Sequence, residues 1–396
     1  MSALTDGDAP CKALAPVLAD PALSAVLDAI EAGDRRGFLV GGAVRNALIG
    51  RAVDDVDIAT DARPRDVMRL ARDAGLKPVP TGIDHGTITV VADGRGFEVT
   101  TFRRDVDTDG RRAVVAFSDD LAEDARRRDF TMNALYADRA GRVIDPVGGL
   151  PDLMDGRLRF VGDPQARIRE DYLRILRFFR FLAWYGRKAD PRAVAACAAL
   201  KDGLARIAPE RIGAEMRKLL AAPDPSDAVR LMADTGVLAQ ILPGAQADTL
   251  PALIAAEGGR PPAWPRRLAC LRAPDAAQAL RLSREEARVQ DALAGALSAG
   301  WSLNEAGYRL GRDLATDHAL IRTASGHDLP EGWADRLAHA AQARLPIAAK
   351  DLIPDLQGHQ IGRGLKAAEA MWIAGDFAVP APALIDAALL AGKAAP

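Results

Sequence analysis

Residues 38–60 (FLVGGAVRNALIGRAVDDVDIAT) place a tight glycine turn a fixed distance before two carboxylates. The apolar run at the start of this stretch ends at Gly41 and Gly42, and it predicts a buried strand that enters a turn. Because glycine has no Cβ, the backbone here can approach a ligand closely and direct its N–H groups outward, and Arg45 adds a fixed charge. The helix-forming segment 43–48 adds the positive end of its dipole. The turn therefore predicts a binding site for phosphate.

Asp55 and Asp57 follow within a segment, 54–58, that is predicted to be a strand. Residues two apart on a strand share one face, so these two carboxylates would project together. Two carboxylates beside a phosphate site are what two hard divalent cations need. A pair of glycines alone is usually only a turn, and two such aspartates alone usually mark a solvated strand edge. Their order and spacing together favour nucleotidyl transfer.

Strand and helix signals divide the chain of 396 residues, which is long enough for two to four domains. Strands are predicted at 38–40, 54–58, 87–92, 97–102, 133–137 and 142–144. Helical segments lie between them, notably 64–74, where Pro64 suits the first turn. After Pro151 strand signals nearly vanish and helices continue to the end. We therefore expect an α+β fold in which a mixed sheet with flanking helices is followed by an all-helical part.

Composition restricts the kind of nucleic-acid site and the cellular compartment that this chain is expected to have. It is 49% apolar and 27% charged, as is ordinary for a globular protein, and its net charge is −2. Any nucleic-acid site must therefore be a local basic patch. The three cysteines are far apart and lack histidine neighbours, which favours a reducing cytoplasm and argues against disulfides and structural zinc. We find neither an apolar run of membrane-spanning length nor a secretory signal, so we expect a cytoplasmic protein without a membrane partner.

The glycine turn and the two carboxylates resemble the catalytic signature of the polymerase β-like nucleotidyltransferases. More narrowly, they resemble the class II tRNA CCA-adding enzymes and bacterial poly(A) polymerases, in which GGxVRDxLLG precedes DxDxAT. The matching residues are Gly41, Gly42, Val44, Arg45, Leu48, Gly50, Asp55, Asp57, Ala59 and Thr60. Asn46 departs from the pattern, since the family often has Asp there. The resemblance implies that Asp55 and Asp57 bind Mg²⁺ and that Gly41, Gly42 and Arg45 orient the triphosphate.

Two further segments extend the resemblance. The segment 97–103 is similar to the family's EVTTFR, and Glu98 would be a third catalytic carboxylate if its strand lies beside 54–58; the alternative is an outward polar residue on an edge strand. The segment 126–135 (RRRDFTMNAL) resembles the family's RRDFTxNA. This implies that Asp129 accepts a hydrogen bond from the ribose 2′-hydroxyl and that Arg128 and Asn133 hold the triphosphate or metal side.

The segment 170–185 (EDYLRILRFFRFLAWY) predicts a strong helix on which Asp171 and Arg174 are neighbours. They could form a surface ion pair worth about 0.3 kcal/mol. The functional alternative is base selection: cytosine and adenine both present an amino donor beside a ring-nitrogen acceptor, which an Asp acceptor and an Arg donor match, whereas uracil and guanine present the reverse. The family pattern EDxxRxxRxxRF implies this role for Asp171 and Arg174, and nucleotide binding for Arg177 and Arg180.

The resemblance also implies a domain order. We expect a nucleotidyltransferase head over 1–150, a base-selecting helical neck over 151–220, a helical body over 221–300 and a helical tail that binds tRNA over 301–396.

The function expected from these features is template-independent addition of C, C and A to the 3′ end of tRNA, using CTP, ATP and Mg²⁺. One alternative is a poly(A) polymerase, which shares nearly every motif. The long polar loop 103–120 accompanies the switch from C to A addition in this family, so it argues against a C-only enzyme but does not exclude an A-only one. The other alternative is a catalytically silent RNA-binding relative, against which the retention of Asp55, Asp57 and Glu98 speaks.

Overall fold

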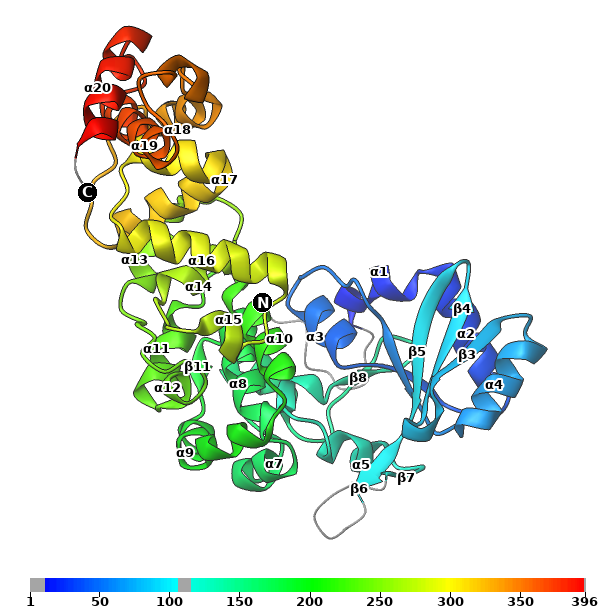
Figure 1. Ribbon diagram of the computed structural model, residues 1–396. Coiled ribbons are helices and arrows are strands. Elements are labelled where there is room, and N and C mark those ends of the chain that lie inside the picture. The colour runs from blue at the N-terminus through cyan, green and yellow to red at the C-terminus, as the bar shows by residue number, and fades with distance from the viewer. Residues whose placement is uncertain (1–10, 106–114, 395–396) are drawn as a thin grey trace. The chain divides into compact units, whose positions relative to one another are not determined.

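A computed structural model describes residues 11–105 and 115–394 of the chain. It divides into two compact units, Met1–Arg206 and Ile207–Pro396. Figure 1 shows the large sheet in the first unit and helices throughout the second. This confirms the α+β fold with an N-terminal sheet. The finer division into head, neck, body and tail stays a prediction.

Seven strands of the described residues form one mixed sheet. In the order of their hydrogen bonding they are β3 (Lys77–Gly82), β4 (Thr87–Ala92), β5 (Arg95–Thr101), β2 (Asp57–Thr60), β1 (Gly37–Val40), β8 (Tyr136–Ala137) and β9 (Val143–Ile144). β2 and β5 run parallel, and the other neighbours are antiparallel. The central strands are buried on both faces, which explains the continuous apolar run of β1.

The strand predicted at 54–58 begins three residues later than expected. Val40 is the last residue of β1 and pairs with Asp57, after which Gly41 turns the chain away. Residues before Asp57 therefore have no partner on β1, and Asp55 lies in the preceding loop. The prediction that Asp55 and Asp57 share a strand face was wrong for this reason.

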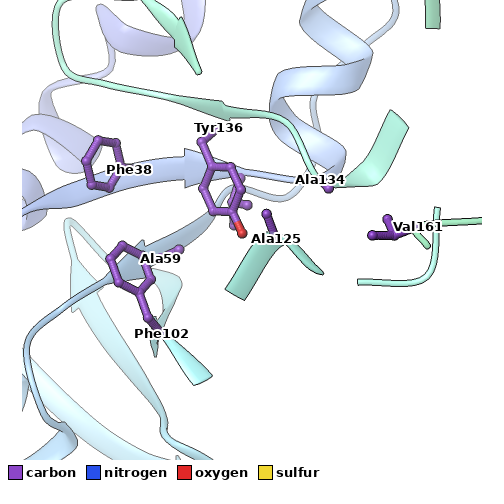
Figure 2. Close-up of a cluster of buried hydrophobic side chains, with 8 residues drawn as sticks. Phe38, Ala59, Phe102, Ala125, Ala134, Tyr136 and Val161 are labelled. Carbon is purple, nitrogen blue, oxygen red and sulfur yellow. The ribbon is translucent and has the colours of Figure 1, made fainter. Parts of the chain in front are cut away.

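Helices cover one face of this sheet, and an aromatic cluster covers part of the other. α2 (Pro21–Glu31) and α4 (Pro64–Asp73) pack against each other and against the sheet, and the Asp20 carboxylate caps α2 by accepting a hydrogen bond from the Ala22 N–H at 3.0 Å. Figure 2 shows the cluster on the opposite face. Its buried members are Phe38, Val40, Ala59, Phe102, Ala125, Ala134, Tyr136 and Val161.

The first unit contains further short strands and helices besides the seven-stranded sheet, α2 and α4. They are η1 (Lys12–Leu14), α1 (Ala15–Leu18), α3 (Gly42–Leu48), η2 (Ile83–His85), β6 (Arg103–Asp105), β7 (Val115–Phe117), α5 (Leu121–Arg126), η3 (Thr131–Asn133), α6 (Gly149–Asp155), β10 (Arg157–Leu158), α7 (Pro164–Glu170), α8 (Leu173–Tyr185), β11 (Lys188–Ala189), α9 (Pro191–Leu200) and η4 (Lys201–Arg206). β6 pairs with β7 at the base of the polar loop, and residues 106–114 of that loop lie outside the described residues.

The helix predicted at 170–185 is broken near its start. α7 ends at Glu170, Asp171 is extended with φ −151° and ψ 107°, and α8 begins at Leu173. The Asp171 carboxylate accepts a hydrogen bond from the Leu173 N–H at 3.0 Å, so this residue caps the new helix instead of continuing the old one. Asp171 and Arg174 are therefore not neighbours on one helix surface.

The second unit consists of helices in its described residues. They are α10 (Pro209–Leu220), α11 (Ser226–Asp234), α12 (Val237–Ile241), α13 (Leu250–Glu257), α14 (Trp264–Cys270), α15 (Ala276–Ala279), α16 (Arg284–Ser298), α17 (Leu303–Ala324), α18 (Trp333–Gln342), η5 (Ala349–Leu352), α19 (His359–Ala374) and α20 (Ala381–Lys393). By itself, none of the helices within residues 11–105 and 115–394 has both the length and the apolar character to cross a bilayer; one sharply bent pair, Lys12–Leu18 with Pro21–Glu31, meets both criteria only when joined.

A buried arginine joins several helices of this unit. Arg267 is 1% exposed and donates hydrogen bonds to the Leu220 carbonyl at 2.7 Å and the Pro223 carbonyl at 3.1 Å. It also donates to the Glu257 carboxylate at 2.7 Å. The carbonyls at the end of α10 lack partners within their own helix, and Arg267 supplies donors for them while Glu257 balances its charge.

Candidate active site

Two of the three predicted carboxylates, Asp57 and Glu98, lie on the central strands of the sheet, and Asp55 precedes Asp57 in the loop before β2. Asp57 pairs with Glu98 in the parallel register of β2 and β5, so both side chains leave the same face. Glu98 alternates outward between buried Phe97 and Val99, and Asp55, Asp57 and Glu98 are all exposed. The predicted neighbourhood of the strands that carry Asp57 and Glu98 is therefore confirmed.

The charge of Asp57 is disfavoured where it lies. The pKa of Asp57 is raised above its usual range, first because neighbouring protein atoms desolvate its carboxylate although it reaches solvent. The charges of Glu98 and Asp55 raise it further, while Arg128 opposes them. Within the described residues, no three His, Cys, Asp or Glu side chains converge closely enough to form a complete metal shell. This group of carboxylates therefore carries an excess of negative charge that a bound cation would neutralise.

The glycine turn beside these carboxylates has a backbone conformation that needs glycine. Gly41 has φ 65° and ψ −115° and precedes α3. A Cβ at this position would also lie 3.4 Å from Nη1 of Arg128 and 3.7 Å from the Asn133 carbonyl oxygen. The positive φ therefore disfavours a side chain here, whereas the contact with Arg128 would be an ordinary van der Waals contact. The turn brings its own backbone close to the Arg128 guanidinium.

Asp129 is the centre of a buried network. Its Oδ1 accepts hydrogen bonds from the Phe130 N–H at 2.8 Å and the Asn133 amide at 3.0 Å, and its Oδ2 accepts from Nε and Nη2 of Arg177. Burial alone would raise the pKa of Asp129, but the Arg177 charge and these donors hold it below its usual range. Four bonds occupy about as many lone-pair sites as a carboxylate has. A ribose hydroxyl would need one of them to give way.

Arg45 is buried, whereas a side chain that binds phosphate directly is expected to be accessible in the free protein. It is 6% exposed, its Nη1 donates to Oδ1 of Asn133, and its Nη2 donates to Oδ1 of Asn46 and to the Tyr185 hydroxyl, each at 2.9 Å. Its guanidinium carbon also lies 3.9 Å from the centre of the Tyr185 ring. The side chain of Arg45 therefore extends from α3 to Asn133 and to the end of α8. Its direct contact with a triphosphate stays a prediction.

The expected base-selecting residues lie at the start of α8. Nη1 of Arg174 donates to the Glu170 carboxylate at 2.6 Å and to the Arg167 carbonyl at 2.7 Å. Arg180 stacks on the Phe181 ring, with 4.4 Å from its guanidinium carbon to the ring centre. The structure thus binds Arg177 to Asp129, which Asn133 links to Arg45, whereas Arg174 is bound to Glu170.

Sequence reasoning missed three residues that contact the predicted site: Asp124, Tyr136 and Tyr185. Asp124 stands four residues before Arg128, a spacing that indicates an ion pair on a helix and could have identified it. The two tyrosines carried no such local signal. Tyr185 contacts Arg45, which is 140 residues away, and Tyr136 contacts Arg128 and Asp124 from a different element.

Comparison with known proteins places this site in a family. The family described as "Poly A polymerase head domain" matches residues 37–159, and "Probable RNA and SrmB- binding site of polymerase A" matches residues 188–249. A CCA-adding enzyme of Geobacillus stearothermophilus is 36% identical over 329 residues, which cover 79% of this chain and 80% of that protein. The chain belongs to the CCA-adding enzyme and poly(A) polymerase family.

Other relatives of this family match over shorter or longer parts. A CCA-adding enzyme of Geobacillus kaustophilus is 45% identical over 209 residues, so the match spans 52% of this chain and about half, 50%, of that relative. The crystal structure of a Bacillus stearothermophilus CCA-adding enzyme in complex with CTP superposes with a TM-score of 0.66 and 29% identity, covering 92% of this chain and 94% of that one. The family assignment from the motifs is confirmed.

Proposed function

We propose that this chain adds C, C and A to the 3′ end of tRNA, with CTP and ATP as substrates. One observation carries the proposal: Asp57 and Glu98 lie in register on neighbouring strands, beside a glycine turn that faces Arg128. This turn and Arg128 would form a phosphate cradle, and a cradle next to clustered carboxylates suits the transfer of a nucleotide and the release of pyrophosphate.

Magnesium fits these residues. Asp55 and Asp57 would hold it, with Glu98 beside them. The pKa of Asp57 is raised first by burial and then by the negative charge of Glu98 and Asp55, which a cation would neutralise. Mg²⁺ in nucleotide sites is commonly held by one or two carboxylates together with substrate phosphates, so a complete protein shell is not required. When bound, the metal would lower the pKa of the RNA 3′-hydroxyl and stabilise the leaving pyrophosphate.

The protein's own residues supply binding and orientation. The Gly41 turn would present its backbone to the triphosphate, and Arg128 offers a positive charge beside it. Asp129 stays ionised and can accept a ribose 2′-hydroxyl if the Arg177 contact shifts. Asp171 and Arg174 would select the base, once Arg174 leaves Glu170. The helices of the second unit would grip the tRNA by its shape and backbone charge.

Poly(A) polymerase is the second candidate, because the head of the chain matches the family described by that name. CCA addition is favoured because the G. stearothermophilus relative that matches over 80% of its length is named a CCA-adding enzyme. A silent RNA-binding relative is disfavoured, since clustered exposed carboxylates would only weaken contact with RNA.

The test is to incubate the protein with Mg²⁺, all four nucleoside triphosphates and tRNA that lacks its last three nucleotides, and to sequence the products. Addition of CCA and then arrest is expected. Long adenylate tracts would show a poly(A) polymerase, and unextended tRNA would support a silent relative.

A further inference from the structure

Arg128 is fixed on two sides and open on the third. Its Nε donates hydrogen bonds to the Tyr136 hydroxyl at 3.0 Å and to Oδ2 of Asp124 at 3.3 Å, and its Nη2 donates to the same Oδ2 at 3.0 Å. Its remaining nitrogen, Nη1, faces the turn at Gly41 and has no hydrogen bond to any residue in the described part of the chain. The guanidinium therefore has one free edge, directed at the cradle.

The two anchoring groups are themselves held rigidly. Asp124 is 3% exposed, and its other oxygen, Oδ1, accepts a hydrogen bond from the Arg103 N–H at 3.2 Å, just beyond β5. The Tyr136 hydroxyl donates to Asp124 at 2.7 Å while it accepts from Arg128. Figure 2 shows the Tyr136 ring packed within the aromatic cluster, with its hydroxyl directed toward the helix that carries Ala125. Neither group can move without disturbing the core.

The electrostatics of this trio keep its hydrogen bonds in one arrangement. Burial raises the pKa of Tyr136 well above its usual range, even though Arg128 opposes this, so its hydroxyl remains a donor at neutral pH. Burial alone would lower the pKa of Arg128, but Tyr136 and Asp124 overcome it and raise the pKa further above its already high value. Arg128 thus stays charged and Tyr136 stays neutral.

We propose that Asp124 and Tyr136 are positioning residues that aim Arg128 at the triphosphate of the incoming nucleotide. The inference rests on the proposed function, and it assigns roles to two residues that do not touch substrate themselves. Donors that are already oriented stabilise developing negative charge without reorganising during the reaction. A guanidinium anchored by Nε and Nη2 also loses little freedom when Nη1 binds phosphate.

Anchoring has a second consequence at this site. Arg128 lies close enough to Asp57 for its charge to lower the pKa of that carboxylate. A loose Arg128 could swing onto the carboxylates and compete with the cation there. Asp124 offers a buried competing carboxylate, so Arg128 remains on the phosphate side of the turn.

The test compares the equilibrium affinity for CTP, titrated with Mg²⁺ but without tRNA, in wild type, Tyr136→Phe, Arg128→Ala and the double variant. Tyr136→Phe keeps the ring in the core and removes the hydroxyl's hydrogen bonds to Arg128 and Asp124. CTP affinity should fall about fivefold, as expected when Arg128 loses one such bond. The melting temperature should fall by a few degrees, because two buried hydrogen bonds are lost, and the affinity for tRNA should be nearly unchanged. Arg128→Ala should weaken CTP binding further, and adding Tyr136→Phe to it should have no additional effect.

Two more variants sharpen the comparison. Asp124→Asn should also weaken CTP binding, but it leaves a buried arginine without its counter-charge and can fail to fold, so Tyr136→Phe carries the decision. Tyr308→Phe is the matched control, since it removes a tyrosyl hydrogen bond to Glu369 at 3.0 Å in the second unit, and it should leave CTP affinity unchanged.

The outcomes separate this inference from the proposed function. CTP affinity in Tyr136→Phe equal to that of wild type would overturn the positioning role, and so would an equal further loss on the Arg128→Ala background. If wild type bound CTP but added no nucleotide to tRNA, the proposed function would fail, while the binding data would still decide the positioning role.

Discussion

Asp57 of β2 stands directly opposite Glu98 of β5, in the parallel pair at the centre of the head sheet. Both carboxylates reach solvent on one face, and the charge of Glu98 adds to burial in disfavouring the ionisation of Asp57. The ionised Asp57 costs stability in the free protein and provides charge that a divalent cation needs. Stability and function therefore oppose each other at this pair.

Removing the charge of Asp57 should stabilise the free protein. The folded pKa of Asp57 lies above its unfolded value, so its contribution to stability is present at low pH and is lost as the pH rises through the folded pKa. At neutral pH the ionised carboxylate is unfavourable. Asp57→Asn should therefore raise the melting temperature at pH 7 without divalent cations. The neighbouring exposed Asp54→Asn serves as control and should change it less; a lower melting temperature in Asp57→Asn would contradict the account.

Gly41→Ala should damage both the fold and nucleotide binding. Gly94, in the turn between β4 and β5, also has a positive φ of 72°, but a Cβ there would meet no atom within 4 Å, so Gly94→Ala isolates the backbone cost. Each substitution should lower the free energy of unfolding by about 1–2 kcal/mol, with the larger loss at Gly41. Only Gly41→Ala should raise the KM for CTP, because only this turn lies beside Arg128 at the proposed phosphate site. An equal effect of both on KM would argue against the cradle.

Asp171→Ala should relax the choice of base. Asp190→Ala is its matched control, since Asp190 caps α9 through the Ala193 N–H at 3.0 Å, as Asp171 caps α8 through Leu173. Both variants should lose about 1 kcal/mol of stability with the cap. Only Asp171→Ala should lower the preference for CTP and ATP over UTP and GTP, by about tenfold or more. If the two variants lost only stability, Asp171 would be a cap and nothing else.

His318 of α17 should make the second unit sensitive to acid. It is fully buried, neither ring nitrogen has a hydrogen bond, and the Ala296 carbonyl lies near without hydrogen-bonding geometry. Burial, and then the charge of Arg322, lower the pKa of His318 from 6.5 to about 4. The unfolded chain binds this proton first, so stability falls as the pH drops from 6.5 towards 4, by up to about 3 kcal/mol.

Thermal unfolding between pH 7.5 and pH 5 checks this expectation. His318→Leu should flatten the acid limb of the melting temperature, whereas the exposed His359→Leu should retain the wild-type slope. An unchanged slope in His318→Leu would show that other groups cause the acid sensitivity.

Local patterns predicted the elements whose stability is local. β4 and β5 alternate apolar and polar residues, and α4 begins with proline at its first turn, so the expected ranges 87–92, 97–102 and 64–74 closely match the structure. β3 was missed because Pro78 and Pro80 weaken the strand signal. Its place at the edge of the sheet tolerates prolines, and that place is visible only in the assembled fold.

The candidate site shows the same division. The sequence motifs identified Asp57, Glu98 and the glycine turn, because each depends on short spacing or on strand alternation. The burial of Arg45 depends on Tyr185, which is 140 residues away, and no local pattern reports such a contact. The anchoring of Arg128 likewise needs the Tyr136 hydroxyl on β8, and no helix or strand spacing reports this contact.

The most direct test of the central claim is the rate at which Asp57→Asn adds CMP to tRNA that lacks its 3′ nucleotides, measured in a single turnover at saturating CTP and Mg²⁺. The account predicts a loss of about a thousandfold or more, with tRNA affinity retained and Asp54→Asn close to wild type. An Asp57→Asn rate within tenfold of wild type would contradict the assignment of Asp57 and its neighbouring carboxylates as the catalytic centre.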